Sequence, residues 1–287
     1  MIVARTVAEV RSLVATARTA RARVGLVPTL GAFHAGHLSL MRRARERCGL
    51  VVVSLFVNPT QFNEVADLDR YPRDEERDAA LASSAGVDVL FAPPTAEVYP
   101  AGFSTTVDVG GVSAPLEGAL RGPKHFRGVA TVVTKLFNMV QPDDAFFGQK
   151  DAQQALLIQH MVRDLDIPIR IEVCPTVREP DGLAMSSRNV LLDPDSRRRA
   201  PAIARALHAV ARVVETGERD ADAALRAGRV VLDGAGIEPE YFAAVSTDTL
   251  APVTRIERET LVAVAARFGA VRLIDNVIVS PAAGSSA

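Results

Sequence analysis

The sequence predicts an α/β protein, with a parallel sheet in its first part and a smaller α+β domain after it. Over residues 1–176, short apolar segments alternate with helical segments, and this rhythm is typical of parallel strands joined by right-handed crossovers. The segment 50–58 is almost continuously apolar, as expected for a strand covered on both faces. Residues 177–287 instead place helices before closely spaced strands, which indicates a separate second domain.

The first domain is defined by short apolar strands and by helices with apolar stripes at helical spacing. The predicted strands lie at 24–29, 50–58, 87–92, 145–148 and 169–177. The predicted helices lie at 6–22, 37–48, 74–85 and 152–165. Parallel sheets bind ligands beyond the carboxyl ends of their strands, so residues that follow these strands are candidate site residues.

The second domain begins after a polar stretch that follows Val177. Its predicted helices lie at 194–216 and 220–232, and its predicted strands at 241–245, 260–266 and 272–279.

Composition excludes several classes of protein. With 33 Lys+Arg and 34 Asp+Glu among 287 residues, the net charge of −1 gives no electrostatic signal for nucleic acid or for an anionic membrane. Two cysteines cannot build a disulfide framework or a Cys-rich zinc site. The apolar runs are too short to span a bilayer, and no secretory leader is recognisable. We therefore expect a cytoplasmic protein without nucleic-acid or membrane partners.

The first candidate cluster follows the strand at 24–29, where residues 27–37 read V-P-T-L-G-A-F-H-A-G-H. Gly31 permits a tight turn. His34 and His37 bracket the start of a helix, where backbone N–H groups and the helix dipole favour phosphate. Imidazoles at this position can donate hydrogen bonds as charge builds in a transition state. The alternative role for both histidines is helix capping or packing alone.

The second cluster follows the strand at 145–148, in the segment F-F-G-Q-K-D-A-Q-Q. Lys150 offers a mobile point charge suited to phosphate. Gln154 offers an amide for a substrate hydroxyl or carboxylate. Asp151 is either the N-cap of the next helix or a ligand contact, and the two roles can coexist.

Two further polar clusters follow predicted strands. Ser186, Ser187 and Arg188 combine hydroxyl groups with a guanidinium, which suits triphosphate oxygens, although a serine here can simply cap a helix. Asn58 and Gln61, in F-V-N-P-T-Q-F, suit a polar uncharged group, or they belong only to an Asn-Pro turn.

In their order along the chain, these motifs resemble those of the pantoate–β-alanine ligase family, within the His-x-Gly-His nucleotidyltransferase superfamily. The similarity also includes H-F-R-G-V, in a segment predicted as a basic loop at 121–128, and P-T-V-R-E-P-D-G-L-A-M-S-S-R-N. It ends with R-L-I-D-N near Asp275. The resemblance implies a Rossmann-like N-terminal domain, a C-terminal lid domain and a homodimer.

The resemblance also implies a two-step reaction. ATP and pantoate give pantoyl adenylate and pyrophosphate, with magnesium, and the amine of β-alanine then attacks the mixed anhydride to give pantothenate and AMP. The expected partners are thus small molecules: ATP, pantoate and β-alanine. Magnesium is expected to accompany ATP, and no tightly bound organic cofactor is expected.

Roles follow for the positions that match the family motifs. Contacts to the reacting phosphates fall to His34, His37, Lys150, Ser186, Ser187 and Arg188. The remaining ATP contacts, with Asp151 on the ribose, fall to Pro28, Leu30, Gly148, Asp151, Val177 and Met185. Contacts to pantoate and β-alanine, with Asn58 on the β-alanine side, fall to Leu30, Asn58, Gln61, Arg121 and Gln154. Asp78 matches an acidic position near magnesium.

Two other functions stay open at this point. A nucleotidyltransferase acting on a phosphorylated alcohol would use the same histidines, although Gln61 and Gln154 favour a small hydroxy acid. A non-catalytic nucleotide binder would not need His34, His37 and Lys150 together.

Overall fold

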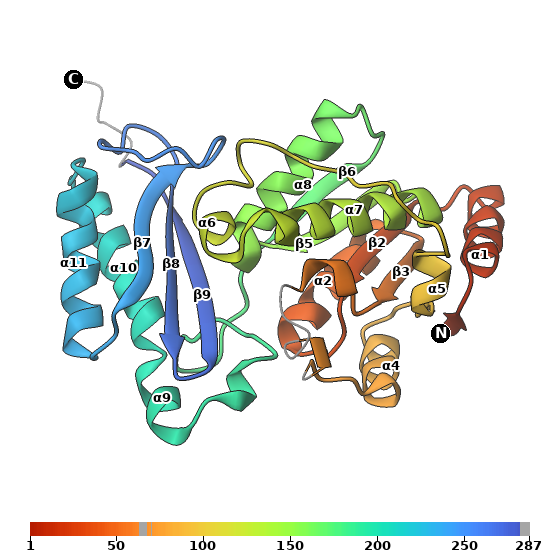
Figure 1. The fold of residues 1–287 in the computed structure, drawn as a ribbon, viewed down its shortest axis with the longest axis horizontal. Helices are drawn as coiled ribbons and strands as arrows, with labels where there is room; N and C mark the ends of the chain where they lie inside the picture. The colour runs from red at the N-terminus through yellow and green to blue at the C-terminus, as the bar shows by residue number, and fades with distance from the viewer. Residues whose placement is uncertain (63–67, 70, 282–287) are drawn as a thin grey trace. The chain divides into compact units, whose positions relative to one another are not determined.

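The computed structural model describes residues 1–62, 68–69 and 71–281 and divides into two compact units (Figure 1). The first unit comprises Met1–Gln149 and Gln153–Pro175, and the second comprises Lys150–Ala152 and Thr176–Ala287. Each unit has its own sheet and its own apolar core.

The first unit confirms the predicted parallel sheet. Its six strands run in the order β1–β4–β3–β2–β5–β6, and all neighbouring pairs are parallel. The strands are β1 (Ile2–Ala4), β2 (Val24–Thr29), β3 (Leu50–Leu55), β4 (Val89–Phe91), β5 (Asp144–Gly148) and β6 (Arg170–Cys174). Sequence analysis did not predict β1, an edge strand of three residues that pairs with β4.

The strand order reverses at β2. Strands β3 and β4 step from β2 toward one edge of the sheet, whereas β5 and β6 step toward the other. β2 pairs with β3 as far as Thr29↔Leu55, but its pairing with β5 consists of Gly25↔Asp144 and Leu26↔Ala145. The two strands β2 and β5 therefore separate toward their carboxyl ends, and such a reversal point is where parallel α/β sheets bind ligands.

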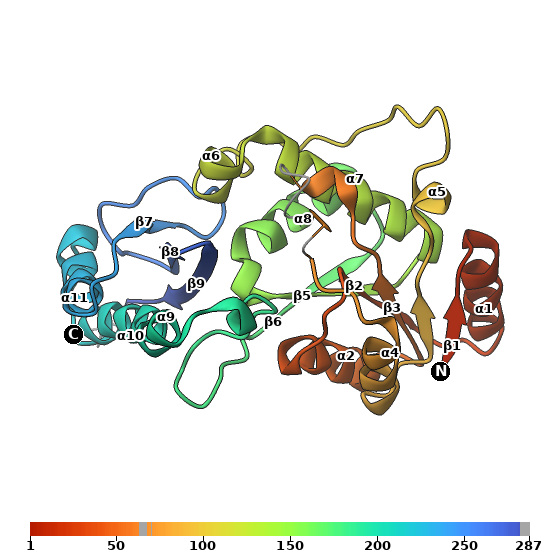
Figure 2. The same ribbon diagram turned by 60° about the horizontal axis from the view of Figure 1, so that its bottom comes forward.

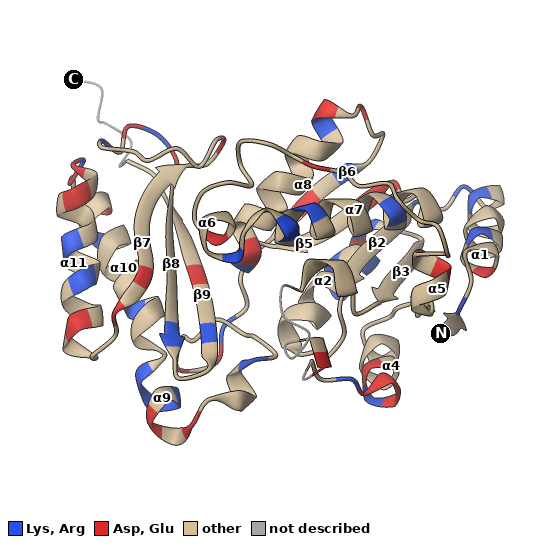
Figure 3. Ribbon diagram, viewed as in Figure 1, with Lys and Arg blue, Asp and Glu red and all other residues tan. Residues whose placement is uncertain are grey.

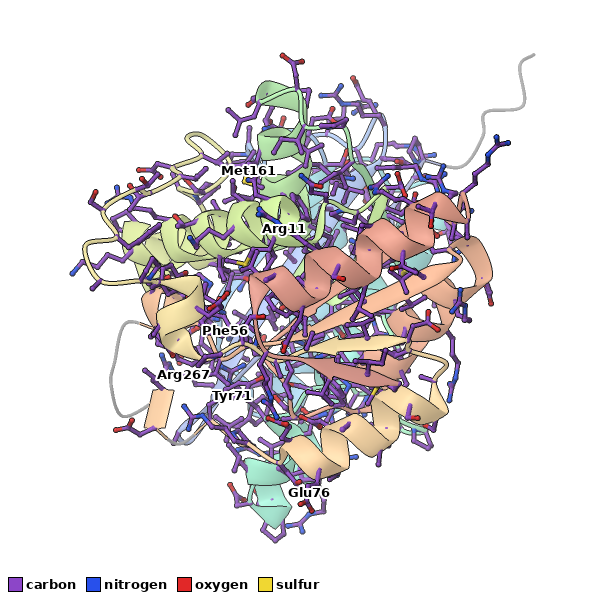
Figure 4. The ribbon with its side chains drawn as sticks, turned by 90° about the vertical axis from the view of Figure 1, so that its right-hand side faces the viewer. Arg11, Phe56, Tyr71, Glu76, Met161 and Arg267 are labelled. Atoms are coloured by element: carbon purple, nitrogen blue, oxygen red, sulfur yellow. The ribbon has the colours of Figure 1, made fainter. Side chains whose placement is uncertain are left out.

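Helices cover both faces of this sheet. Figure 2 shows α7 (Pro123–Val140) and α8 (Ala152–Asp164) over one face, and α2 (Ala35–Arg47) and α4 (Glu75–Ser84) over the other. Figure 4 shows α1 (Val7–Thr19) and α4 on opposite sides of the strands. The guanidinium of Arg11 on α1 donates to the carbonyl of Asn138 on α7 over 3.2 Å. Two short helices, α5 (Thr95–Val98) and α6 (Glu117–Arg121), precede α7.

The loop predicted at 121–128 is wrong, because this segment lies in α6 and α7. Gly122 separates the two helices with a φ of +76°, and Pro123 opens α7 at its first position, where no N–H is needed. Gly and Pro in this segment mark helix boundaries. The apolar face of α7 is buried, including Val129, Val133 and Leu136, so the helix is part of the core.

A buried carboxylate lies at the start of β5. Asp144 is fully buried and accepts hydrogen bonds from Arg23 (2.6 and 3.0 Å) and from Arg170 (2.6 Å). Burial raises the pKa of Asp144, but the hydrogen bonds from the two arginines lower it more, so the pKa lies below its ordinary value of 3.8. The stabilising effect is thus present above the ordinary pKa of an aspartate and is lost as the pH falls through the lowered one.

We predict that Asp144→Asn lowers the free energy of unfolding at pH 7 by about 1–2 kcal/mol, a modest loss because both arginines are half-exposed and screened by water. Urea unfolding at several pH values measures the effect. The difference from the parent protein should shrink as the pH falls below 3.8, the ordinary pKa of an aspartate, and the parent carboxylate also becomes protonated. Asp164→Asn is the control, because Asp164 forms an exposed pair with Arg163. A difference that stays constant with pH would contradict a role for the charge.

The second unit contains an antiparallel sheet covered by helices. Its strands run in the order β7 (Pro239–Ser246), β8 (Thr260–Phe268) and β9 (Val271–Val279), and α10 (Ala202–Glu215) and α11 (Ala221–Gly234) lie against this sheet (Figure 1). The single helix predicted at 194–216 is wrong, because the segment forms α9 (Pro194–Arg199) and then α10. Pro201 lies between them and has no N–H with which to continue the first helix.

Charged residues of both signs are interspersed along α4, α9 and α11, as Figure 3 shows. Within the described part of the chain, no helix is both long enough and apolar enough to cross a membrane.

Candidate active site

The turn after β2 has an unusual backbone. Gly31 and Ala32 both adopt left-handed conformations, with φ of +95° and +53°. The φ of Gly31 is one that residues with a side chain rarely adopt, and a Cβ there would also lie 2.6 Å from Leu55 Cδ1, so glycine is favoured at this position. The turn ends at His34, which is the N-cap of α2.

His34 and His37 cap α2 reciprocally. His34 Nδ1 accepts the backbone N–H of Gly36 over 3.1 Å, and His37 Nδ1 accepts the backbone N–H of His34 over 3.3 Å. The two imidazole centroids lie 4.1 Å apart. The spacing His-x-x-His is thus that of a capping box, in which the side chains at N-cap and N3 accept N–H groups of the first turn and of the N-cap.

This cap fixes the tautomer of both rings. A ring nitrogen that accepts a hydrogen bond carries no proton, so the neutral rings carry their proton on Nε2. The histidines therefore do cap the helix, and this role is compatible with anion binding by the same two rings. Nε2–H groups held at a helix N-terminus are suited to donate to an anion.

Asp78 supports this turn from α4. One carboxylate oxygen accepts the N–H of Ala32 over 2.7 Å, and the other accepts the N–H of Phe33 over 2.8 Å. The residue is only 1% exposed. Burial raises the pKa of Asp78, although the two backbone N–H groups act in the opposite direction. Both oxygens therefore support the turn, and the predicted position of Asp78 near magnesium stays a prediction.

The described side chains of the first unit form no cluster that could hold a resident metal ion. Among the described residues of the whole chain, no group of three or more His, Cys, Asp and Glu side chains is arranged to hold one.

The amides of Asn58 and Gln61 form an ordered pair around the short helix η1 (Pro59–Gln61). Asn58 is fully buried; its Nδ2 donates to the carbonyl of Gly128 (3.1 Å) and to Gln61 Oε1 (3.0 Å). Its Oδ1 accepts from Thr60 and from the Tyr99 hydroxyl, the latter over 2.8 Å. Asn58, predicted on the β-alanine side, thus has its polar atoms engaged within the protein. It orients Gln61, whose Nε2 is left as the donor of the pair.

Gly128 allows α7 to approach η1 closely. A Cβ on Gly128 would lie 2.4 Å from the carbonyl oxygen of Thr60 and 2.8 Å from the Cα of Gln61. The glycine is therefore required by contact with another backbone, and the contact holds Gln61 in place.

We predict that Gly128→Ala destabilises the protein by about 1–3 kcal/mol, because the added methyl group collides with a backbone. Helix propensity alone would give the opposite sign, since alanine stabilises a helix interior by up to about 1 kcal/mol. Urea unfolding distinguishes the two signs. Gly110→Ala is the matched control, since its Cβ would meet nothing within 4 Å. A Gly128→Ala protein as stable as its parent would contradict the packing argument.

Sequence reasoning missed the residues that support this side of the site. Gln153 is buried and bonds to the carbonyls of Val112 and Pro115 and to the N–H of Glu117, whereas the predicted ligand Gln154 is half-buried. Arg121, predicted to contact substrate, bonds to the buried carboxylate of Glu117 over 2.8 Å. Gln153 and Gln154 have the same side chain and are neighbours in sequence. Which of the two is buried depends on which face of α8 packs against the protein, and the motif does not show that.

Pro28, Leu30 and Gly148 lie in the first unit, whereas the second unit holds Lys150, Asp151, Val177 and Met185–Arg188. Lys150 lies in η2 (Gln149–Asp151), with its Nζ 3.7 Å from the carboxylate of Asp151. The side-chain amide of Asn276 on β9 donates to the carbonyl of Lys150 over 3.0 Å. The C-terminal D-N motif thus fixes the backbone at Lys150, an interaction that the motif alone does not predict.

Residues 177–185 form a hairpin that leads into Ser186–Arg188. The N–H of Met185 donates to the carbonyl of Val177, and Arg178 forms a bridge with Ala184. The guanidinium of Arg178 binds Asp275 of β9 through two hydrogen bonds, of 2.6 and 3.1 Å. Asp275 is 3% exposed, so a buried carboxylate anchors the hairpin. After it, Ser186 Oγ accepts the N–H of Arg188 over 3.2 Å, so the serine stabilises a turn.

The two cysteines are buried, and neither takes part in these clusters. Burial raises the pKa of both Cys48 and Cys174 to about 11. Such thiols are protonated at neutral pH and unreactive.

A cavity of about 290 Å³ lies beyond the carboxyl ends of β3 and β4, next to Phe56, Pro59 and Arg73. Figure 4 labels Phe56 in this region. Within the described residues, its lining contains none of the predicted site residues.

The sheet reverses its strand order at β2, and a histidine-capped helix follows that strand. This arrangement is typical of nucleotide-binding α/β folds. The sequence profile of the pantoate-beta-alanine ligase family matches residues 2–278. A pantothenate synthetase of Roseiflexus castenholzii is 56% identical over 89% of this chain and 92% of its own length. One of Pelotomaculum thermopropionicum is 52% identical over 97% and 99%.

Solved structures agree. The crystal structure of pantothenate synthetase from Thermus thermophilus is 49% identical, with a TM-score of 0.92 over 98% of this chain and 100% of that one. The pantoate-beta-alanine ligase from Francisella tularensis, complexed with beta-gamma ATP and beta-alanine, is 34% identical, with a TM-score of 0.81 over 97% of each chain. The chain therefore belongs to the pantoate–β-alanine ligase family.

Proposed function

We propose that this protein is an ATP-dependent ligase that condenses pantoate with β-alanine to form pantothenate. In the first step, a carboxylate oxygen of pantoate attacks the α-phosphorus of ATP, and the bond from that phosphorus to the β-phosphate oxygen breaks. Pyrophosphate leaves, and pantoyl adenylate remains. In the second step, the amine of β-alanine attacks the activated carbonyl carbon, AMP leaves with the electrons of the broken C–O bond, and the amine loses a proton.

Activation is necessary because a carboxylate is a poor electrophile. Neither step requires a covalent enzyme nucleophile, so the protein contributes positioning and charge stabilisation. The acyl adenylate reacts with water, which makes a covering domain useful. We propose that residues 177–287 act as this lid domain and residues 1–176 as the ATP- and pantoate-binding domain.

One observation carries the proposal: the reciprocal cap of His34 and His37 at the reversal of the sheet. Their Nδ1 atoms accept backbone N–H groups, which places the ring proton on Nε2, the atom that can donate to phosphate oxygens. The negative charge that develops on the transferred α-phosphoryl group favours such donors.

The other roles are proposals that follow from the chemistry of each group. Lys150, Ser186, Ser187 and Arg188 are proposed to bind phosphate oxygens as pyrophosphate leaves. The adenosine and the rest of the nucleotide are proposed to contact Pro28, Leu30, Gly148, Asp151, Val177 and Met185. Pantoate is proposed to contact Gln61 and Gln154, with Asn58 acting through Gln61.

Magnesium is proposed to enter with ATP as a substrate complex, because the described side chains do not form a cage for it. We further propose a homodimer in the cytoplasm, as the family resemblance implies. The two free, buried cysteines are consistent with a reducing compartment. A transferase acting on a phosphorylated alcohol and a non-catalytic nucleotide binder are not favoured, since the family match covers residues 2–278.

The test of the proposed reaction is exchange of labelled pyrophosphate into ATP, with magnesium and without β-alanine. A reversible acyl-adenylate step predicts exchange that appears only when pantoate is present. β-Alanine added afterwards should release AMP and pantothenate. A folded protein that binds ATP but shows no pantoate-dependent exchange would overturn the proposal.

We predict that His34→Asn lowers the exchange rate about 10²–10³-fold, the usual effect of removing one transition-state donor. Asparagine is a good N-cap, so the unfolding free energy should change by less than about 0.5 kcal/mol. This variant therefore separates catalysis from capping. His208→Asn, at an exposed position on α10, is the control. Exchange at the parent rate would show that His34 is only a cap.

A further inference from the structure

The turn between β2 and α2 is held in a conformation that its residues do not favour. Ala32 has a φ of +53°, in the left-handed region that is unfavourable for a residue with a side chain. Such a conformation persists when surrounding groups determine it. The groups that do so here belong to α4, far along the chain.

Asp78 supplies the main restraint. Its two oxygens accept the N–H groups of Ala32 and Phe33, at 2.7 and 2.8 Å, across more than forty residues of sequence. The neighbouring Arg77 adds a hydrogen bond from its guanidinium to the carbonyl of Phe33 over 3.2 Å. Successive N–H groups that converge on one carboxylate fix the direction of the peptide planes between residues 31 and 33.

The next residue is His34, and its backbone N–H determines the tautomer of His37. Because that N–H donates to His37 Nδ1, a rotation of the preceding peptide would move the N–H and release the ring. His34 would also lose its alignment with the N–H of Gly36. Both imidazoles therefore depend on the turn that Asp78 holds.

We propose that Asp78 is a positioning residue, which fixes the orientation and tautomer of His34 and His37 through the turn at residues 31–33. This inference rests on the proposed function and deepens it. It is an alternative to the expectation that Asp78 lies near magnesium. The carboxylate is 1% exposed, and each of its oxygens accepts one backbone N–H, so it is placed to support the turn.

The test uses Asp78→Asn in the full-length protein. Asparagine has one acceptor oxygen, so its NH₂ group must face one of the two backbone N–H groups. Long-range ¹H–¹⁵N spectra of the imidazoles report the tautomers of His34 and His37 without substrate. We expect one tautomer, protonated at Nε2, in the parent protein and a mixture in the variant. We expect the maximal rate of pantoate-dependent exchange to fall about 10–100-fold, with no change in the magnesium concentration that gives half-maximal rate.

A second substitution keeps the test decisive if Asp78→Asn weakens folding. Glycine adopts a positive φ without steric cost, so Ala32→Gly in the Asp78→Asn background should recover part of the rate and of the Nε2–H signal. A lost metal ligand would not be rescued in this way. Asp74→Asn is the matched control, because Asp74 is the N-cap of the same helix and its side chain accepts the N–H of Arg77.

Two results would overturn the proposal. If the tautomers are unchanged in Asp78→Asn and the magnesium requirement rises, Asp78 acts on the metal. If the tautomers and the rate are both unchanged, the turn does not need the carboxylate. Because the spectra need no substrate, failure of the exchange reaction in the parent protein is distinguishable from failure of this inference.

Discussion

The reversal of strand order at β2 is the constraint on which the first half of the site depends. β2 remains paired with β3 to its last residue, Thr29, whereas its pairing with β5 ends at Leu26↔Ala145. The carboxyl ends of β2 and β5 therefore diverge, and the turns that follow them border the opening. One turn leads to His34, and the other begins at Gly148. A ligand at this point meets a helix N-terminus without needing a net positive charge on the protein.

At the N-terminus of α2, the side chains of His34 and His37 both stabilise the helix and are proposed to bind phosphate. A serine or aspartate would cap α2 equally well, but an imidazole that caps through Nδ1 also carries a donor on its second ring nitrogen. The cost of the arrangement is the left-handed backbone at Ala32, which a carboxylate from α4 stabilises. Asn58 also combines folding with positioning. Its amide is hydrogen-bonded to the backbone of α7, and it binds Gln61 Oε1, so Gln61 Nε2 is the end that can donate to a ligand.

Sequence patterns were most informative where one element determines its own structure. β2 was predicted with its observed bounds, and the helix at 152–165 ends one residue from the observed α8, because apolar periodicity and nearby turns define both. The helix α7 was missed because Gly122, Pro123 and Gly128 suggest a loop. Only the tertiary contact with Thr60 explains Gly128.

Within the site, sequence identified the residues but not how they act. The motifs singled out His34, Asn58 and Asp78, yet nothing in them shows that Asp78 accepts the N–H of Phe33 or that Asn58 donates to the carbonyl of Gly128. Those partners lie 45 and 70 residues away along the chain. Such long-range hydrogen bonds depend on the packing of whole elements, which a local pattern does not encode.

The central claim is that ATP binds at the divergence of β2 and β5, with its phosphates at the N-terminus of α2. The most direct measurement is a titration of the ¹⁵N-labelled protein with magnesium and ATP, followed through backbone amide shifts. The account predicts the largest shifts at residues 34–37 and 148–149. Largest shifts around Phe56, Pro59 and Arg73, which line the cavity beyond β3 and β4, would contradict it.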